Sequence, residues 1–157
     1  MKENGKPILL ATDGSPSARR AVETAVGLAK TMGRSLVAVA VWNVPVTTYA
    51  YGAVGWVPEL AEAEKDRARK ALDEASALAG HAGIAFEPVL VEGLAVEAIC
   101  DAAGSHDAEL IVIGSHGWGA VKRLWFGSVS TGVLHEAHRP VLVVPSEELG
   151  EARAVAA

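Results

Sequence analysis

The sequence has a single cysteine, Cys100, and no long apolar run among its 157 residues. One cysteine cannot form an internal disulfide, which suits a reducing compartment. No apolar stretch approaches the roughly 20 residues that a transmembrane helix needs, and the first seven residues lack the apolar core of a signal peptide. We therefore expect a cytoplasmic protein with no membrane association.

Basic residues are in the minority. The chain has 14 Lys and Arg against 19 Asp and Glu, which gives a formal net charge of −5 at pH 7. The charges are spread along the chain and form no basic stripe. Proteins that bind DNA or RNA generally use a basic surface to displace counterions from the phosphates. The composition thus argues against general binding of nucleic acids.

The commonest nucleotide motifs and catalytic constellations are also missing. The sequence contains no G-x-x-x-x-G-K-S/T loop and no G-x-G-x-x-G opening a helix after its first strand. It shows no nucleophile elbow. His135 and His138 do not form an H-E-x-x-H pair and have no evident third metal ligand, so we interpret them as surface residues. These absences argue against a dedicated hydrolase or transferase.

The sequence does contain a regular alternation of short apolar runs and amphipathic helical segments. Half of the residues are hydrophobic and 21% are charged, as in compact globular domains. The alternation predicts five strands and four helices, hence an α/β fold with a single doubly wound, five-stranded parallel sheet and helices on both faces. We expect one domain at 1–146 and a C-terminal tail at 147–157. The expected strands are Pro7–Thr12, Leu36–Trp42, Ile84–Val91, Glu109–Ile113 and Pro140–Val144, and the expected helices are Pro16–Met32, Glu59–Leu78, Val96–Ala103 and Ser128–Ala137.

This architecture predicts the place of a ligand before any motif is considered. In open parallel sheets, ligands bind beyond the carboxyl ends of the strands, where the strand order reverses. The loops that deserve inspection are therefore Thr12–Ser15, Asn43–Pro58 and Gly114–Gly127. Pro88 lacks an amide hydrogen, which places the third strand near a sheet edge or at a bulge.

The loop after the fourth expected strand is rich in glycine. Gly114, Gly117 and Gly119 follow the strand, and Gly127-Ser128 directly precedes the last helix. Glycine permits positive φ angles and lets an anion approach the backbone amides closely, and a helix N-terminus favours negative charge. The loop is therefore a candidate phosphate site. The alternative is a purely structural turn that requires positive φ.

The glycine spacing resembles a known family pattern. Gly114-x-x-Gly117, nine further residues and Gly127-Ser128 resemble the G-2x-G-9x-G-S/T pattern of the universal stress protein family. The resemblance runs from Ile8 to Val144 and includes the opening Leu-Ala-Thr-Asp-Gly-Ser and the closing His-Arg-Pro-Val-Leu-Val-Val-Pro. It implies a Rossmann-like fold, bound ATP (or AMP or another adenine nucleotide), accompanying Mg²⁺ or Mn²⁺, and a homodimer formed through Val141, Leu142, Val143 and Val144.

The resemblance also implies a set of site residues. The glycine loop would hold the phosphates, Asp13 would approach the ribose and phosphates, and the adenine would rest near Val41. His116 either contacts a phosphate or is solvated. The complete candidate set is Ala11, Thr12, Asp13, Val41, Ile113, Gly114, Ser115, His116, Gly117, Gly119, Gly127, Ser128, Val129 and Ser130.

Several questions stay open at this level. Trp118 and Trp125 could cover a bound base or pack on the sheet, and Lys122 and Arg123 could reach phosphates or remain solvated. Residues 43–58 could form a lid or a packed flap. Two functions are compatible with the sequence: a nucleotide-responsive stress or signalling module with at most slow ATP hydrolysis, or a dimeric binding or scaffold protein that does not depend on nucleotide.

Overall fold

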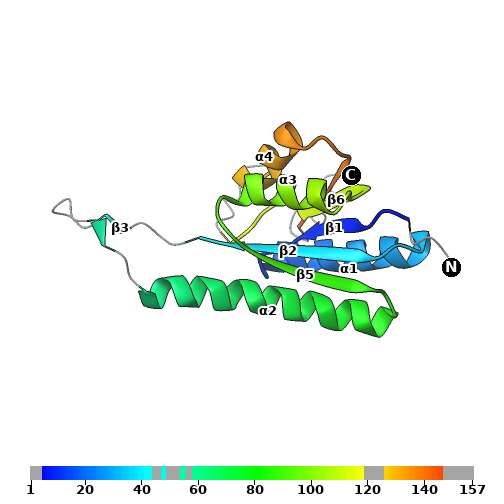
Figure 1. Ribbon diagram of the computed structural model, residues 1–157, viewed down its shortest axis with the longest axis horizontal. Helices are drawn as coiled ribbons and strands as arrows, with labels where there is room; N and C mark the ends of the chain where they lie inside the picture. Colours follow the sequence, from blue (N-terminus) through cyan, green and yellow to red (C-terminus); the bar gives the residue numbers. More distant parts are fainter. Residues whose placement is uncertain (1–4, 44–46, 49–53, 56–57, 119–125, 147–157) are drawn as a thin grey trace, which may run out of the picture.

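The computed structural model describes residues 5–43, 47–48, 54–55, 58–118 and 126–146. The described residues form a three-layer α/β structure in which a parallel sheet lies between two layers of helices (Figure 1). Helices α3 and α4 cover one face of the sheet, and α1 and α2 cover the other. The strands of the sheet are β1 (Ile8–Ala11), β2 (Leu36–Trp42), β5 (Phe86–Glu92), β6 (Leu110–Gly114) and β7 (Val141–Val144), and the helices are α1 (Pro16–Met32), α2 (Pro58–Ala82), α3 (Ala95–Ser105) and α4 (Ser128–Glu136).

The predicted fold class is confirmed, and each expected strand and helix has its counterpart. Two short strands, β3 (Thr47–Thr48) and β4 (Val54–Gly55), pair antiparallel within the segment considered as a lid. The rest of 44–57 lies outside the described residues, as do Gly119, Lys122, Arg123, Trp125 and the tail at 147–157. Within the described part of the chain, no helix is both long and apolar enough to cross a membrane.

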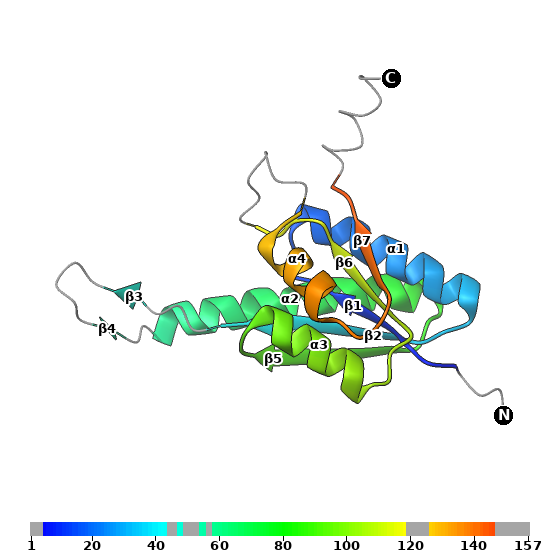
Figure 2. The ribbon, with the colours of Figure 1, turned by 90° about the horizontal axis from the view of Figure 1, so that it is seen from above.

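The strand order is β5-β2-β1-β6-β7, and all neighbours in this sheet are parallel. The chain runs outward from β1 through β2 to β5, and then returns to the other side of β1 to form β6 and β7 (Figure 2). The order therefore reverses between β1 and β6, where a ligand crevice is expected. Pro88 lies on β5, an edge strand, as its missing amide hydrogen predicts.

Strand β1 is the centre of the core. Ile8, Leu9 and Leu10 are each 0% exposed. Because side chains alternate along a strand, Leu10 packs with α1 and α2 whereas Leu9 packs with α3 and α4. The helices meet the sheet largely through alanines, among them Ala21 and Ala75. These small side chains let the helices lie close to the sheet.

The turn from β1 into α1 is fixed by local hydrogen bonds. The Ser15 amide donates to Asp13 Oδ1 at 2.9 Å, and the Ser15 hydroxyl caps the helix by accepting from the Ala18 amide at 3.2 Å. Pro16 occupies the first helical turn, and Gly33 ends the helix with φ of 65°. These are the start and stop signals that the sequence predicts. They place Asp13 directly after the carboxyl end of β1, with its carboxylate bonded to the start of α1.

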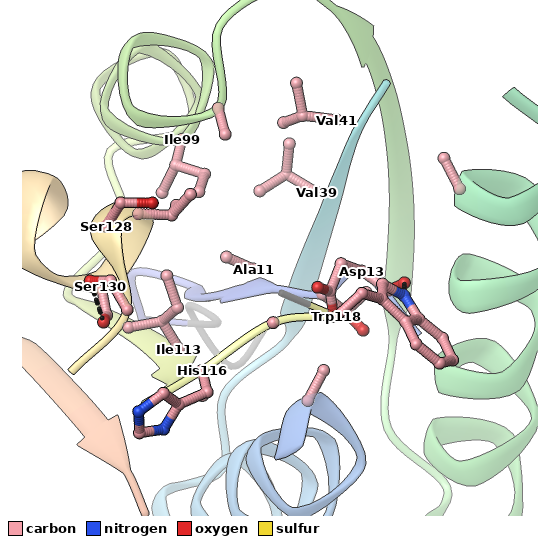
Figure 3. A pocket seen from close by; sticks show the side chains of 18 of the residues that line it. Ala11, Asp13, Val39, Val41, Ile99, Ile113, His116, Trp118, Ser128 and Ser130 are labelled. Carbon is pink, nitrogen blue, oxygen red and sulfur yellow. Dashed lines mark hydrogen bonds between the residues drawn. The ribbon is translucent and has the colours of Figure 1, made fainter. Parts of the chain in front are cut away.

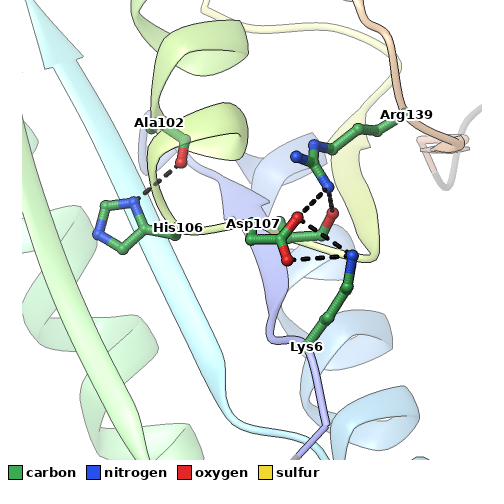
Figure 4. Close-up of polar contacts among 6 residues, drawn as sticks. Lys6, Ala102, His106, Asp107 and Arg139 are labelled. Atoms are coloured by element: carbon green, nitrogen blue, oxygen red, sulfur yellow. Dashed lines mark hydrogen bonds and ion pairs between the residues drawn. The ribbon is translucent and has the colours of Figure 1, made fainter.

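At the opposite, amino end of the sheet, three segments are joined by an ionic cluster around Asp107 (Figure 4). Lys6, just before β1, lies 3.0 Å from Asp107 Oδ2, and Arg139, just before β7, lies 3.0 Å from Oδ1. Arg139 also donates to the Ala108 carbonyl oxygen at 2.6 Å. Hydrogen bonds from Lys6 and Arg139 hold the pKa of the Asp107 carboxyl below its usual value.

We expect this cluster to make a pH-dependent contribution to the free energy of unfolding. The variant Asp107→Asn removes that contribution and so allows it to be measured. Asparagine tolerates the left-handed backbone at this position, where φ is 49°, so the variant removes charge without adding strain. Since the folded pKa is depressed, the unfolded chain takes up the proton first, and the contribution is present above about pH 4 and lost on further acidification. In urea titrations we expect wild type to be the more stable at pH 7 and the two proteins to converge below about pH 4. Parallel pH profiles would contradict this account.

Candidate functional site

A cavity of about 530 Å³ opens at the carboxyl ends of β1, β2 and β6. Figure 3 shows Ser128 and Ser130 of α4 on one side of it and Asp13 with Trp118 on the other, with Ala11 between them. Val39, Val41, Ile99 and Ile113 supply apolar wall. Twelve of the fourteen residues predicted from the sequence line the cavity: Ala11, Thr12, Asp13, Val41, Ile113, Gly114, His116, Gly117, Gly127, Ser128, Val129 and Ser130.

Ser115 lies behind the cavity wall and organises it. Its amide donates to the Val144 carbonyl oxygen at 2.8 Å, and its own carbonyl oxygen accepts from the Gly127 amide at 2.6 Å and from the Ser130 hydroxyl at 3.0 Å. Its hydroxyl oxygen accepts from the Ser146 amide at 3.2 Å and lies 3.0 Å from His116 Nδ1. Ser115 is only 1% exposed. It therefore ties the loop after β6 to both α4 and β7.

Close packing, and not a positive φ, distinguishes three glycines of the loop. A Cβ at Gly117 would lie 2.6 Å from Asp13 Oδ2, one at Gly114 would lie 3.1 Å from the Ser17 carbonyl oxygen, and one at Gly127 would lie 3.3 Å from the Ser115 carbonyl oxygen. None of these three glycines has a positive φ. The interpretation of the loop as a turn that needs positive φ is therefore wrong for these positions. All three glycines line the cavity, so the loop backbone forms part of its wall.

The N-terminus of α4 faces the cavity without a side-chain cap. Gly127 is the N-cap residue and makes no side-chain hydrogen bond to the helix, while Ser128, Val129 and Ser130 line the cavity. The first amides of a helix have no partner within the helix, and together with the helix dipole they favour an anion. The Ser130 hydroxyl is directed inward, to the Ser115 and Gly127 carbonyl oxygens. An anion at this position would therefore meet backbone amides and the Ser128 hydroxyl.

The side of the cavity nearest α2 contains residues that the sequence analysis did not select. Glu64, Arg67 and Ala68 line it together with Trp118. The Trp118 indole donates to the Asp13 carbonyl oxygen at 2.8 Å, and the Arg67 guanidinium lies 5.8 Å from the centre of the Trp118 ring. Trp118 therefore lines the cavity at its mouth, with 59% of its surface exposed. The sequence did not predict that Arg67 lies at the cavity. Helical periodicity identifies the buried face of α2, but it does not show which turn of the helix lies near the carboxyl ends of the strands.

Comparisons with known proteins identify a family for the chain. The model of the "Universal stress protein family" matches residues 5–145. A relative from Thermus aquaticus, the universal stress protein in QAH/OAS sulfhydrylase 3′ region, is 40% identical over 139 residues, which are 88% of this chain and 98% of the relative.

Solved structures give the same result. A universal stress protein family member from Burkholderia pseudomallei has a TM-score of 0.72 at 32% identity, covering 92% of this chain and 99% of that one. A universal stress protein solved in complex with cAMP has a TM-score of 0.66 at 26% identity, covering 90% and 98% of the two chains. With the family model spanning nearly its whole length, this chain belongs to the universal stress protein family.

Proposed function

We propose that this chain binds an adenine nucleotide, ATP before others, in the cavity at the carboxyl ends of β1, β2 and β6, and acts as a nucleotide-responsive stress or signalling module. The observation that carries the proposal is the pairing of an α4 N-terminus without a side-chain cap with three loop glycines that line the same cavity. The relative solved with cAMP binds an adenine nucleotide on a similar fold.

The cavity suits both halves of such a ligand. Its volume of about 530 Å³ is within the range of roughly 300–1,000 Å³ typical of small-molecule sites. Val39, Val41 and Ile99 offer apolar surface for the adenosine, and the α4 amides with the loop after β6 offer donors for phosphates. Each helix-terminus contact contributes about 0.3–1 kcal/mol, so we expect affinity to come from several amides acting together.

The proposed Mg²⁺ or Mn²⁺ would rely on Asp13 and on the nucleotide itself. Mg²⁺ commonly binds through one or two carboxylates plus substrate phosphates and retains several waters. Asp13 Oδ1 accepts from the Ser15 amide, while Oδ2 lies toward Gly117 in the loop. Among the residues that the structure describes, no cluster of three His, Cys, Asp or Glu side chains could hold a metal alone. When bound, the ion would offset the negative charge of the phosphates. We propose that hydrolysis of ATP by this protein is at most slow.

We also propose a homodimer through β7. This strand is at the edge of the sheet, and its outer side pairs with no strand among the described residues. Leu142 on β7 is 36% exposed. Pairing with a second β7 would satisfy the open backbone groups of both edges. Because Ser115 bonds to both the loop and the end of β7, nucleotide binding and dimer contacts would share one hydrogen-bonded connection.

Isothermal titration calorimetry tests the nucleotide proposal. The protein is first stripped of carried-over nucleotide and then titrated with ATP and Mg²⁺, AMP and cAMP in separate experiments. We expect a saturable heat with a stoichiometry near one ATP per chain, and weaker binding of the monophosphates. If none of the three binds to the folded, stripped protein, the nucleotide proposal is wrong and a nucleotide-independent scaffold becomes the better description.

A further inference from the structure

Positive charge is scarce among the described residues that line the cavity. In the described part of its lining, Asp13 and Glu64 are acidic, and Arg67 is the one lysine or arginine. A chain of two or three phosphates has several negative charges, and nearby carboxylates repel it. A polyphosphate ligand therefore benefits from positive charge beyond that of the proposed metal ion, and Arg67 is the described side chain in place to provide it.

Arg67 is held at the wall of the cavity by contacts that it can exchange. Its guanidinium lies 3.1 Å from Glu64 Oε1 and over the face of Trp118. Half of the Arg67 side chain is exposed, as is about a third of that of Glu64. Exposed ion pairs and exposed cation–π contacts are weak. An incoming phosphate can thus compete for the guanidinium, which suits bidentate binding of phosphate.

Trp118 sets the position of Arg67 relative to the glycine loop. It directly follows Gly117, and its indole bond to the Asp13 carbonyl oxygen directs the ring toward α2. The described part of the loop, Gly114–Trp118, therefore runs from Ser115, which is bonded to Gly127 at the α4 N-terminus, past Asp13 to Trp118 beside Arg67. A phosphate chain laid along this loop from α4 would end beside the guanidinium.

We propose that Arg67, seated on Trp118, binds the phosphates farthest from the α4 N-terminus and thereby selects nucleoside di- and triphosphates over monophosphates. This inference rests on the proposed nucleotide function, and it identifies the residue that distinguishes nucleotides by their number of phosphates. Trp118 acts as a positioning residue, since it contacts Arg67 and the Asp13 backbone.

The test compares ATP, AMP and adenosine on wild type, Arg67→Gln and Arg67→Lys by calorimetry. Because the loss of a hydrogen bond between charged groups lowers affinity about tenfold or more, we expect Arg67→Gln to bind ATP about tenfold more weakly than wild type. Its affinity for adenosine, which has no phosphate, should be unchanged. Arg67→Lys should restore part of the preference for ATP. The affinity of wild type for ATP should also fall more steeply with salt than that of Arg67→Gln.

Arg69→Gln is the matched control. Arg69 is on the same helix, its side chain is 51% exposed, and it pairs with Asp66 at 3.2 Å. It therefore matches Arg67 in exposure and in ion pairing but does not line the cavity. We expect its ATP affinity to equal that of wild type. An equal loss for ATP, AMP and adenosine in Arg67→Gln, or no loss at all, would overturn the inference. Failure of wild type to bind any nucleotide would instead reject the proposed function on which it rests.

Discussion

Replacing Gly117 with valine should abolish measurable binding of ATP while leaving the protein folded. Even the first added carbon would lie 2.6 Å from Asp13 Oδ2. If Asp13 turned aside, it would give up the hydrogen bond that its other carboxylate oxygen accepts from the Ser15 amide. The new side chain would both displace this carboxylate and cover loop amides. Losing two or more hydrogen bonds to a charged ligand corresponds to about a hundredfold or greater loss of affinity.

A graded series distinguishes a blocked site from a damaged fold. Gly117→Ala should show a smaller loss than valine, since it displaces Asp13 but covers less of the loop. Gly80→Ala is the control: Gly80 is exposed on α2 and has no atom within 4 Å of an added Cβ. It should bind ATP as wild type does, with slightly higher stability because alanine favours helix. ATP binding to Gly117→Val with wild-type affinity, measured by calorimetry on protein with a native circular dichroism spectrum, would show that the ligand does not use this loop.

The elements of the fold were predictable because each has a local cause. The apolar run at Ile8–Leu10 is buried on both faces, and Ser15, Pro16 and Gly33 mark the ends of α1 by their own hydrogen bonding and backbone geometry. Pro88 indicated an edge strand because proline lacks a ladder donor. Helix ends were less accurate: α2 runs to Ala82 and not to Leu78, because alanine, glycine and histidine after Leu78 give no strong stop before Gly83.

The residues of the candidate site were likewise predictable only where their position has a local cause. Its strand-end residues were predictable, since parallel strands bring Ala11 and Ile113 to one edge in register. The α2 side was not, because Arg67 and Trp118 are 51 positions apart in sequence and meet only through tertiary packing. The reason for the glycines was also missed in part. Periodicity and composition cannot show that Gly114 packs against the Ser17 backbone, because that contact depends on how α1 crosses β6.

The second large effect concerns stability. We expect Leu10→Ala to lower the free energy of unfolding by about 3–5 kcal/mol, the upper part of the range for buried leucines. Leu10 is 0% exposed in the central strand, and it packs in a cluster with Ala21, Ala25 and Ala75. The alanines of this cluster have no side chain long enough to fill the space that a truncated leucine leaves. The cavity should therefore persist, and its cost adds to the lost transfer free energy.

Urea denaturation of Leu10→Ala beside Leu78→Ala measures this effect. Leu78 is on the outer part of α2 and is 38% exposed, so its truncation should cost less than about 1 kcal/mol. The dependence of unfolding free energy on urea should be the same in both, since the surface exposed on unfolding barely changes. Equal losses in the two variants would contradict the placement of β1 at the centre of the core. A selective loss would show that β1, which leads directly to Asp13 at the cavity, is part of the buried core that stabilises the fold.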